Sequence, residues 1–237
     1  MAAATPVSKS ARDRARQEIT EEILRVARDH LARDGAAALS LRAVARDVGM
    51  VSSAVYRYVP NREALLTLLI IEAYDSLGDA VERVDSKLAR HHFTERFLAT
   101  AHAVRDWALA NPHQYALVYG SPVPGYSAPD DTIAPASRVP FVLLSIIRDS
   151  PRVASKNELS NDALASALKP LRNLAGVGIN DELLCAGLSA WATLLGWISL
   201  ELFGHLHNVV AEPKPKRRAL FDHQMRAVAA DLENLIG

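Results

Sequence analysis

The stretch 48-VGMVSSAVYRYVPNREALL-66 decides which fold is expected for the N-terminal part of this chain. Between Gly49 and Pro60 there is room for about two turns of helix, and Val55 and Val59, four residues apart, would be its buried stripe. The remaining positions carry serines, tyrosines and an arginine. A helix this short is marginal by itself, so we expect other helices to support it and its polar face to have a use.

Two helices are expected before this stretch. Apolar residues four apart predict an amphipathic helix over about residues 14–33, which Gly35 would end in a left-handed conformation. The segment 40–49 then has apolar residues at i, i+3, i+4 and i+7, with Ser40 as the N-cap and Gly49 as the end. Two short helices joined by a tight turn and supported by longer helices form a helix-turn-helix, whose second helix enters the major groove of DNA.

The outward face of the second helix carries the side chains that such a motif needs. With Val55 and Val59 facing inward, four residues lie toward the other side: Ser52, Ser53, Tyr56 and Arg57. Serine hydroxyls can contact base edges or phosphates, and the guanidinium of Arg57 suits guanine or phosphate. Tyr58 and Arg62 are placed to bond the sugar-phosphate backbone.

The charge of the chain is distributed unevenly. Residues 1–62 hold eleven Lys and Arg against seven Asp and Glu, a net charge of +4, whereas the whole chain has a net charge of zero. A basic N-terminal part favours a nucleic-acid partner if the positive groups share a face. Helix pairs with tight turns also occur as plain scaffold with a solvated polar surface, and pattern alone leaves that alternative open.

The segment resembles the tetracycline-repressor (TetR) family of bacterial regulators over residues 14–66. The family signature around the recognition helix reads roughly A-G-V-S-x-x-x-L-Y-x-H/Y-F-x-x-K-x-x-L, where this chain has V-G-M-V at 48–51 and V-Y-R-Y-V-P-N-R-E-A-L at 55–65. The supporting helix, T-x-x-x-I-A in the family, is similar to S-L-R-A-V-A at 40–45. Val51 replaces a capping Ser of the signature, and Val59 replaces Phe.

The resemblance implies specific DNA contacts. Residues expected at bases or their adjacent phosphates are Arg42, Ser52, Ser53 and Tyr56, and those expected at the backbone are Ser40, Tyr58 and Arg62. It also implies a ligand-responsive repressor that binds a palindromic operator in double-stranded DNA as a homodimer. Arg12, Arg14 and Arg16 form either an arm toward the minor groove or a solvated helix end.

The rest of the chain is expected to be helical, which makes the fold all-α. Helices are predicted near 61–81, 93–111, 112–119, 140–149, 161–171, 181–206 and 217–236. Residues 122–140 contain five prolines, and we expect no regular element there. The prediction is therefore a three-helix DNA-binding domain at 1–62, with its N-terminal arm, and a larger helical domain for effector binding and dimerisation at 63–237.

The larger domain resembles the C-terminal subgroup named for a Trp-His-Gly motif. Trp191 and Gly196 match this motif, and Leu195 stands where the His would be. The candidate ligand-binding residues are His102, Trp107, Asn111, Tyr115, Tyr119, Trp191 and Leu195. The substitution of His by Leu195 favours an apolar or aromatic effector. Aromatic residues at helical spacing are more often core than pocket, so packing is the alternative.

Small residues in the second-last long helix suggest a dimer interface. Gly187, Ala190 and Gly196 would let a partner helix approach closely, which favours a four-helix bundle across a two-fold axis. Close packing within one monomer is the competing explanation.

Other functional classes have little support in the sequence. No run approaches the roughly 18 apolar residues of a membrane span, and the N-terminus lacks a secretory apolar region, so a cytoplasmic protein without a membrane partner is expected. The lone Cys185 excludes an intrachain disulfide and is expected in the core.

We find no spaced carboxylate pair, glycine-rich phosphate loop or Ser-His-Asp candidate, and we expect no enzyme and no cofactor. His205 and His207, with Glu201 one turn earlier, have ligand-like spacing, but we expect no metal because His is also favoured at helix ends. The alternative function is a helical small-molecule-binding module, or an enzyme, without regulatory DNA binding. Binding to its own promoter would distinguish a regulator from both.

Overall fold

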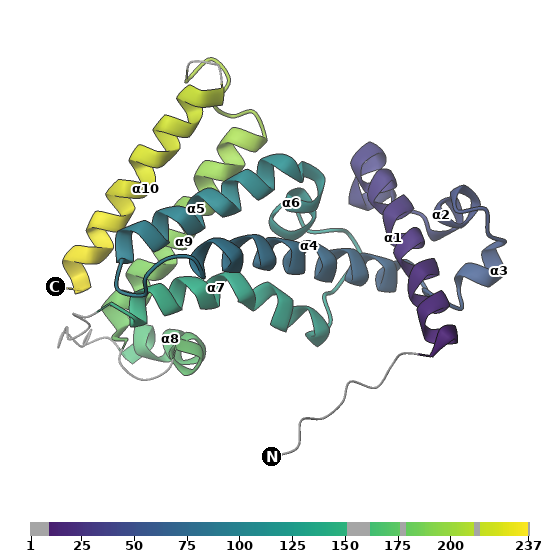
Figure 1. Cartoon of the computed structure of the whole chain (residues 1–237), viewed down its shortest axis with the longest axis horizontal. Helices are drawn as coiled ribbons and strands as arrows, with labels where there is room; N and C mark the ends of the chain where they lie inside the picture. Colours follow the sequence, from purple (N-terminus) through teal and green to yellow (C-terminus); the bar gives the residue numbers. More distant parts are fainter. Residues whose placement is uncertain (1–9, 151–161, 176–178, 211–213, 237) are drawn as a thin grey trace. The chain divides into compact units, whose positions relative to one another are not determined.

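The computed structural model describes residues 10–150, 162–175, 179–210 and 214–236, and these residues form helices without any strand (Figure 1). The all-α prediction is therefore confirmed over the described residues. The helices are α1 (Ala11–Ala38), α2 (Leu41–Asp47), α3 (Ser52–Val55), α4 (Arg62–Asp85), α5 (Phe93–Ala110), α6 (Pro112–Tyr119), the 3₁₀ helix η1 (Asp130–Thr132), α7 (Ile133–Arg148), α8 (Asp162–Ala175), α9 (Asp181–Leu202) and α10 (Lys214–Ile236).

Helix ends follow local chemistry at most of these boundaries. Ser10 and Asp13 form a capping box that starts α1, and Gly35, with φ of 76°, interrupts the helical conformation near its end. The amide of Leu183 donates to Asn180 Oδ1 at 2.8 Å, which caps α9. The side-chain oxygen of Asn61 likewise accepts from the amide of Ala64 at 2.7 Å.

The expectation of an irregular segment throughout residues 122–140 is wrong. Helix α7 begins at Ile133 and runs through Pro140, so only the part before it lacks a longer helix. Pro135 lies in the first turn, where the missing amide would have no helical partner. Pro140 removes one hydrogen bond, but buried Val139 and Ile146 anchor the helix on both sides of it. Tertiary packing thus outweighs the local effect of proline.

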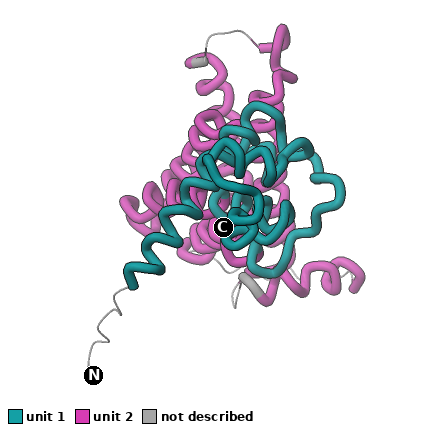
Figure 2. Tube along the Cα trace, turned by 90° about the vertical axis from the view of Figure 1, so that its right-hand side faces the viewer, with its two compact units in different colours: residues 1–73, 113–132 teal, residues 74–112, 133–237 magenta. Residues whose placement is uncertain are grey.

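The chain divides into two compact units, coloured separately in Figure 2. Unit 1 consists of residues 1–73 and 113–132, and unit 2 consists of residues 74–112 and 133–237. This division differs from the predicted boundary at 62/63 because α4 contributes to both units. Leu65, Leu66 and Leu69, in the first part of α4, are essentially inaccessible to solvent. Their spacing reveals a buried face but does not show which unit they join.

Each unit has its own hydrophobic core. In unit 1, α1 packs against α2 and α2 against α3. In unit 2, α5 packs against α7, α9 and α10, and α8 packs against α9. The guanidinium of Arg105 on α5 donates to both oxygens of Glu201 on α9, at 2.7 and 2.6 Å, and both side chains are buried. Glu201, considered as a metal ligand from the sequence, is therefore part of an internal ion pair.

Helix α9 is unusually apolar for its exposure. It is long and apolar enough to span a membrane by length and composition, yet only 28% of its most apolar window is buried. The exposed positions Leu188, Ala192, Gly196 and Leu200 form one stripe, which Phe203 extends just after the helix ends; Ser189 beside the stripe is also exposed. Ala190, by contrast, is buried, and a Cβ on Gly187 would contact Ile147 of α7 at 3.5 Å. Of the three small residues singled out in the sequence, only Gly196 faces open space.

Candidate nucleic-acid interface

Helices α2 and α3 form the predicted helix-turn-helix, with α1 beside them in unit 1 (Figure 1). The hydroxyl of Ser40 accepts from the amide of Ala43 at 3.4 Å and caps α2. Gly49 has φ of 79°, a conformation that glycine adopts without strain, and the amide of Met50 donates to Ala45 O at 2.9 Å. These two features close the turn between the helices.

The recognition segment is shorter in regular helix than predicted. Helix α3 covers only Ser52–Val55, and turns continue the coil as far as Tyr58. The amide of Val59 still donates to Val55 O at 3.0 Å, and both valine side chains are completely buried. Val51 is the N-cap and makes no side-chain capping bond within the described residues. The two buried valines therefore fix the orientation of this segment.

Most of the predicted contact residues are exposed. Around α3 and the turns after it, the exposed side chains are Ser52, Ser53, Tyr56 and Arg57. Ser40 and Arg42, at the start of α2, are also exposed, whereas Tyr58 is half-buried. The structure thus brings hydroxyl, phenol and guanidinium groups together on the outer side of one motif. Such groups can donate to phosphates and base edges without unfolding any core.

Arg16 holds the recognition segment from α1. Its Nη2 donates to Arg57 O at 3.0 Å, and its guanidinium lies 5.4 Å from the centre of the Tyr58 ring. Arg12, Arg14 and Arg16 all lie within α1, so in this structure they belong to a helix and not to an extended arm. Residues 1–9 lie outside the described residues. No pattern in the sequence connects positions 41 residues apart, and the role of Arg16 was missed for that reason.

The guanidinium of Arg62, expected from the sequence to bond the DNA backbone, bonds the backbone of the protein in this structure. Its guanidinium donates to Leu39 O at 3.0 Å, Ala36 O at 2.9 Å and Ala37 O at 3.1 Å. These carbonyls end α1 and lead into α2, where helix geometry leaves backbone acceptors without partners. Arg62 therefore fastens the start of α4 to the α1–α2 connection, which positions the helix-turn-helix.

A second bond that the sequence did not predict joins α1 to α2. His30 is buried, and its Nε2 lies 2.7 Å from Asp47 Oδ2. The hydrogen bond with His30 is the main cause that lowers the pKa of Asp47 below its usual value. His30 and Arg62 both join α1 to the segment that supports the recognition helix.

Comparison with known proteins gives one consistent result. A family model described as bacterial regulatory proteins, tetR family, matches residues 23–69, and a model described as tetracyclin repressor-like, C-terminal domain, matches residues 97–228. The HTH-type transcriptional regulators Rv1816 of Mycobacterium tuberculosis (strain H37Rv) and Mb1846 of Mycobacterium bovis are each 39% identical over 223 residues, which is 92% of this chain and 94% of each relative. The chain belongs to the tetR family of bacterial regulatory proteins.

A solved relative agrees with this assignment. The crystal structure of regulatory protein SCO4313 matches with a TM-score of 0.75 at 33% identity, covering 94% of this chain and 98% of that one. The TetR-like fold and a role in transcription regulation are thereby confirmed for this TetR regulator. The family model at 23–69 contains α2 and α3, so the matched segment includes the helix-turn-helix.

The ligand-binding residues predicted for this TetR regulator are divided between the two units. Tyr115 and Tyr119 belong to unit 1, with ring centres 5.2 Å apart, whereas the other five belong to unit 2. Trp107 is buried, and its Nε1 donates to Ser76 Oγ at 3.0 Å. His102 Nε2 lies 2.9 Å from Asp222 Oδ1. Trp107 and Tyr115 are buried, whereas His102 and Tyr119 are half-buried.

Asn111 also makes a structural contact, and none of the predicted ligand-binding residues lines the pocket found in unit 2. The side-chain amide of Asn111 donates to Trp107 O at 2.9 Å, at the end of α5. A pocket of about 820 Å³ lies elsewhere in unit 2, among α4, the α4–α5 connection and α7, and none of the seven predicted residues lines it. Their ligand-binding role, and that of Trp191 and Leu195, stays a prediction.

Proposed function

We propose that this TetR regulator is a homodimeric, ligand-responsive repressor that acts in the cytoplasm and binds a palindromic operator. The observation that carries the DNA-binding part is the recognition segment, where buried Val55 and Val59 leave Ser52, Ser53 and Arg57 exposed. Tyr56 and Arg42 extend this surface. We propose that these side chains contact bases and adjacent phosphates, that Ser40 and Tyr58 contact the backbone, and that Arg62 acts by positioning α2.

The exposed stripe on α9 supports the dimer. Three large apolar side chains along and just after this helix are substantially exposed: Leu188 (47%), Leu200 (40%) and Phe203 (45%). An apolar patch of this kind often marks a protein–protein interface. A Cβ added to Gly196, in the middle of the stripe, would meet nothing within 4 Å. The helix backbone can therefore be approached closely there. We propose that α9 and α10 of two chains pack as a four-helix bundle and present two recognition helices to one palindrome.

We propose further that a small apolar or aromatic molecule binds in the part of the chain after the helix-turn-helix and lowers operator affinity. For this effect the molecule must bind the DNA-free conformation more tightly than the DNA-bound one, because equal affinity for both shifts nothing. The pocket in unit 2 supports the proposal because its volume is that of a typical small-molecule site.

The test is to incubate the purified full-length protein with fragments of its genome and to sequence the fragments that it retains. A regulator is expected to enrich a palindromic site in a promoter, and a mobility shift on that site should require double-stranded DNA of the same sequence. A helical binding module or an enzyme would retain no defined sequence at moderate salt, and that result would reject the proposal.

A further inference from the structure

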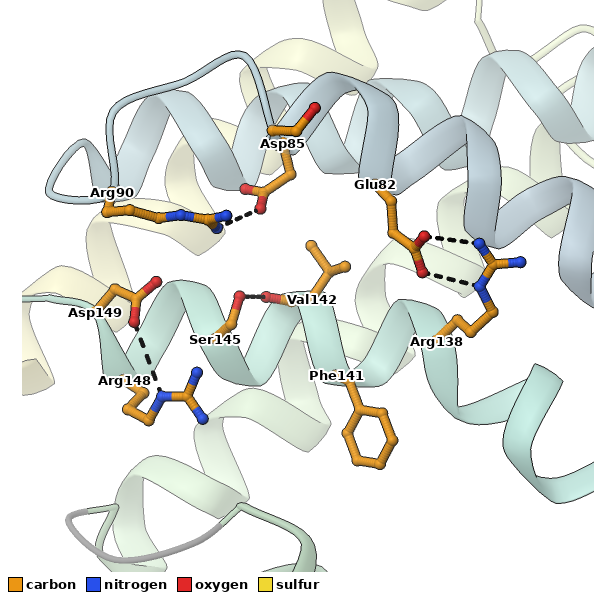
Figure 3. A pocket seen from close by; sticks show the side chains of 10 residues that line it. Glu82, Asp85, Arg90, Arg138, Phe141, Val142, Ser145, Arg148 and Asp149 are labelled. Atoms are coloured by element: carbon orange, nitrogen blue, oxygen red, sulfur yellow. Dashed lines mark hydrogen bonds and ion pairs between the residues drawn. The ribbon is translucent and has the colours of Figure 1, made fainter. Parts of the chain in front are cut away.

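The pocket in unit 2 has a charged wall on each side and an apolar surface between them (Figure 3). Its ten lining residues come from the last turns of α4, from the α4–α5 connection and from α7 with the residue after it. All of them belong to one compact unit, so the pocket is defined without reference to the other unit.

A buried arginine, Arg96, holds the two carboxylates at one end of the pocket in place. Arg96 on α5 is completely buried, and it donates to both oxygens of Asp85 at 2.7 and 3.1 Å and to Asp149 Oδ2 at 3.0 Å. Its remaining bonds go to Arg90 O and Ser145 Oγ, both at 3.1 Å. Replacing a buried ion cluster by apolar groups is often neutral or stabilising, so stability alone does not explain this one.

Two arginines at the same end have N–H groups that are not used in hydrogen bonds within the described residues. Arg90 and Arg148 are 61% and 59% exposed. Arg90 uses Nη1 to bond Asp85 Oδ2 at 2.8 Å, and Arg148 Nε lies 3.8 Å from Asp149 Oδ1, which is too long for a hydrogen bond. Arg90, Arg96 and Arg148 face two carboxylates, Asp85 and Asp149, which leaves one positive charge uncompensated.

The opposite end has the reverse charge. Arg138 donates to both oxygens of Glu82, at 2.8 and 2.7 Å, and it also bonds Asp75 and Asp79. One guanidinium thus faces three carboxylates, and its donors are already used. The hydrogen bonds from Arg138 lower the pKa of Glu82, so this end stays negative at neutral pH. An anionic group is therefore accepted only at the other end.

Between the two ends lies an apolar surface. Phe141 is 45% exposed, and Val142 lines the pocket next to it on α7. In Figure 3 the two residues lie along α7 between Arg138 and Arg148, with Val142 pointing toward α4 and the ring of Phe141 pointing away from it. An exposed phenyl ring within a charged pocket offers apolar contact area to a ligand.

We propose that this pocket binds an amphipathic organic monoanion, a carboxylate whose head is held by Arg90 and Arg148 and whose apolar body lies on Phe141 and Val142. Arginine suits a carboxylate because its planar fork can donate two parallel hydrogen bonds. The single uncompensated charge selects a monoanion, and the negative end excludes a second acidic group. That such a ligand is the effector rests on the proposed function, whereas its binding does not.

The test is titration calorimetry at pH 7 of the full-length protein with three probes that share one alkyl chain: octanoate, octan-1-ol and octylammonium. Octanoate is expected to bind about tenfold more tightly than octan-1-ol, because a charge-assisted bond adds to the same apolar contact. Arg148→Gln and Arg90→Gln should each remove that preference and leave octan-1-ol unchanged. Phe141→Ala should weaken octanoate and octan-1-ol alike.

Arg83→Gln is the matched control, because Arg83 is an exposed arginine of α4 that does not line the pocket. The Arg148 side chain makes no hydrogen bond within the described residues, so Arg148→Gln should fold normally. It keeps the test valid even if Arg90→Gln, which loses the bond to Asp85, disturbs the fold. Equal binding of the three probes, or octanoate binding that survives both arginine substitutions, overturns the proposal.

The effector role is tested separately with a labelled operator. Octanoate should lower operator affinity in the wild type and have no effect in Arg148→Gln. If the protein retains its operator but binds no octanoate, the ligand class is wrong and the regulatory function stands. If octanoate binds with the expected selectivity but no DNA sequence is retained, the proposed function fails and the carboxylate site stands.

Discussion

Arg62→Met separates positioning from DNA contact at the helix-turn-helix. The substitution keeps most of the alkyl stem of Arg62 and removes the three hydrogen bonds that it donates to Ala36 O, Ala37 O and Leu39 O. We expect it to loosen the connection that leads into α2. Operator affinity should fall although the side chain does not contact DNA.

The expected loss of stability can be worked from these bonds. A hydrogen bond from a charged donor contributes about 1.5–3 kcal/mol net when it stands alone. The three bonds at 2.9–3.1 Å share one half-buried guanidinium and are not additive, so we expect a total loss of about 2–3 kcal/mol. For a chain of this length, that corresponds to a fall of about 4–6 °C in Tm.

The assay has two readouts. Thermal and urea unfolding measure stability, and mobility shifts over a range of salt concentrations measure operator affinity and its salt dependence. Each phosphate contact contributes about 0.9 to the slope of log K against log salt concentration. A positioning role predicts that Arg62→Met lowers stability and affinity with an unchanged slope. Arg57→Met is the matched control, since the exposed Arg57 side chain should affect operator affinity and leave Tm unchanged.

A normal Tm for Arg62→Met together with a shallower salt slope would refute this reasoning. That outcome would mean that the guanidinium leaves the carbonyls and binds a phosphate, as the resemblance to TetR regulators implied.

Three further predictions concern unit 2. Gly196→Leu should keep the monomer folded, because its side chain enters open space, but should convert a dimer into monomers in sedimentation at micromolar concentration; an unchanged dimer would place the interface elsewhere. Arg96→Met should cost about 3–5 kcal/mol of unfolding free energy in urea, because it leaves buried Asp85 with the exposed Arg90 as its one charged partner among the described residues, and a loss below about 1 kcal/mol would contradict this. The pKa of Glu82 lies below its ordinary 4.5 because of Arg138, so this pair stabilises the fold fully above about pH 4.5 and loses its effect as pH falls through the lower folded value. Glu82→Gln should therefore be less stable than wild type at pH 7, by a difference that shrinks as the pH falls below 4.5, and a difference that does not change with pH would rule the pair out as the cause.

The sequence predicted the helices well wherever the signal is local. The cap at Ser40, the left-handed glycines at 35 and 49, and the apolar spacing of α4, α5, α9 and α10 act within about one turn of helix, and the expected elements formed there. The orientation of the recognition segment followed for the same reason, since Val55 and Val59 determine which face is buried. Most of the exposed candidates for DNA contact lie within one turn of these two valines, so the sequence also predicted their exposure.

What the sequence by itself determined is thus the all-α class, the helix-turn-helix and its outward face, because each depends on side chains only a few residues apart. Only the tertiary structure decided that α7 continues through Pro140, that Arg16 and Arg62 hold the recognition element, and that Arg96 underlies a charged pocket. These features depend on partners as far as 53 residues apart or on packing that outweighs local propensity. A guanidinium bonds whichever acceptor the folded chain brings near it, and no periodicity in the sequence records that choice.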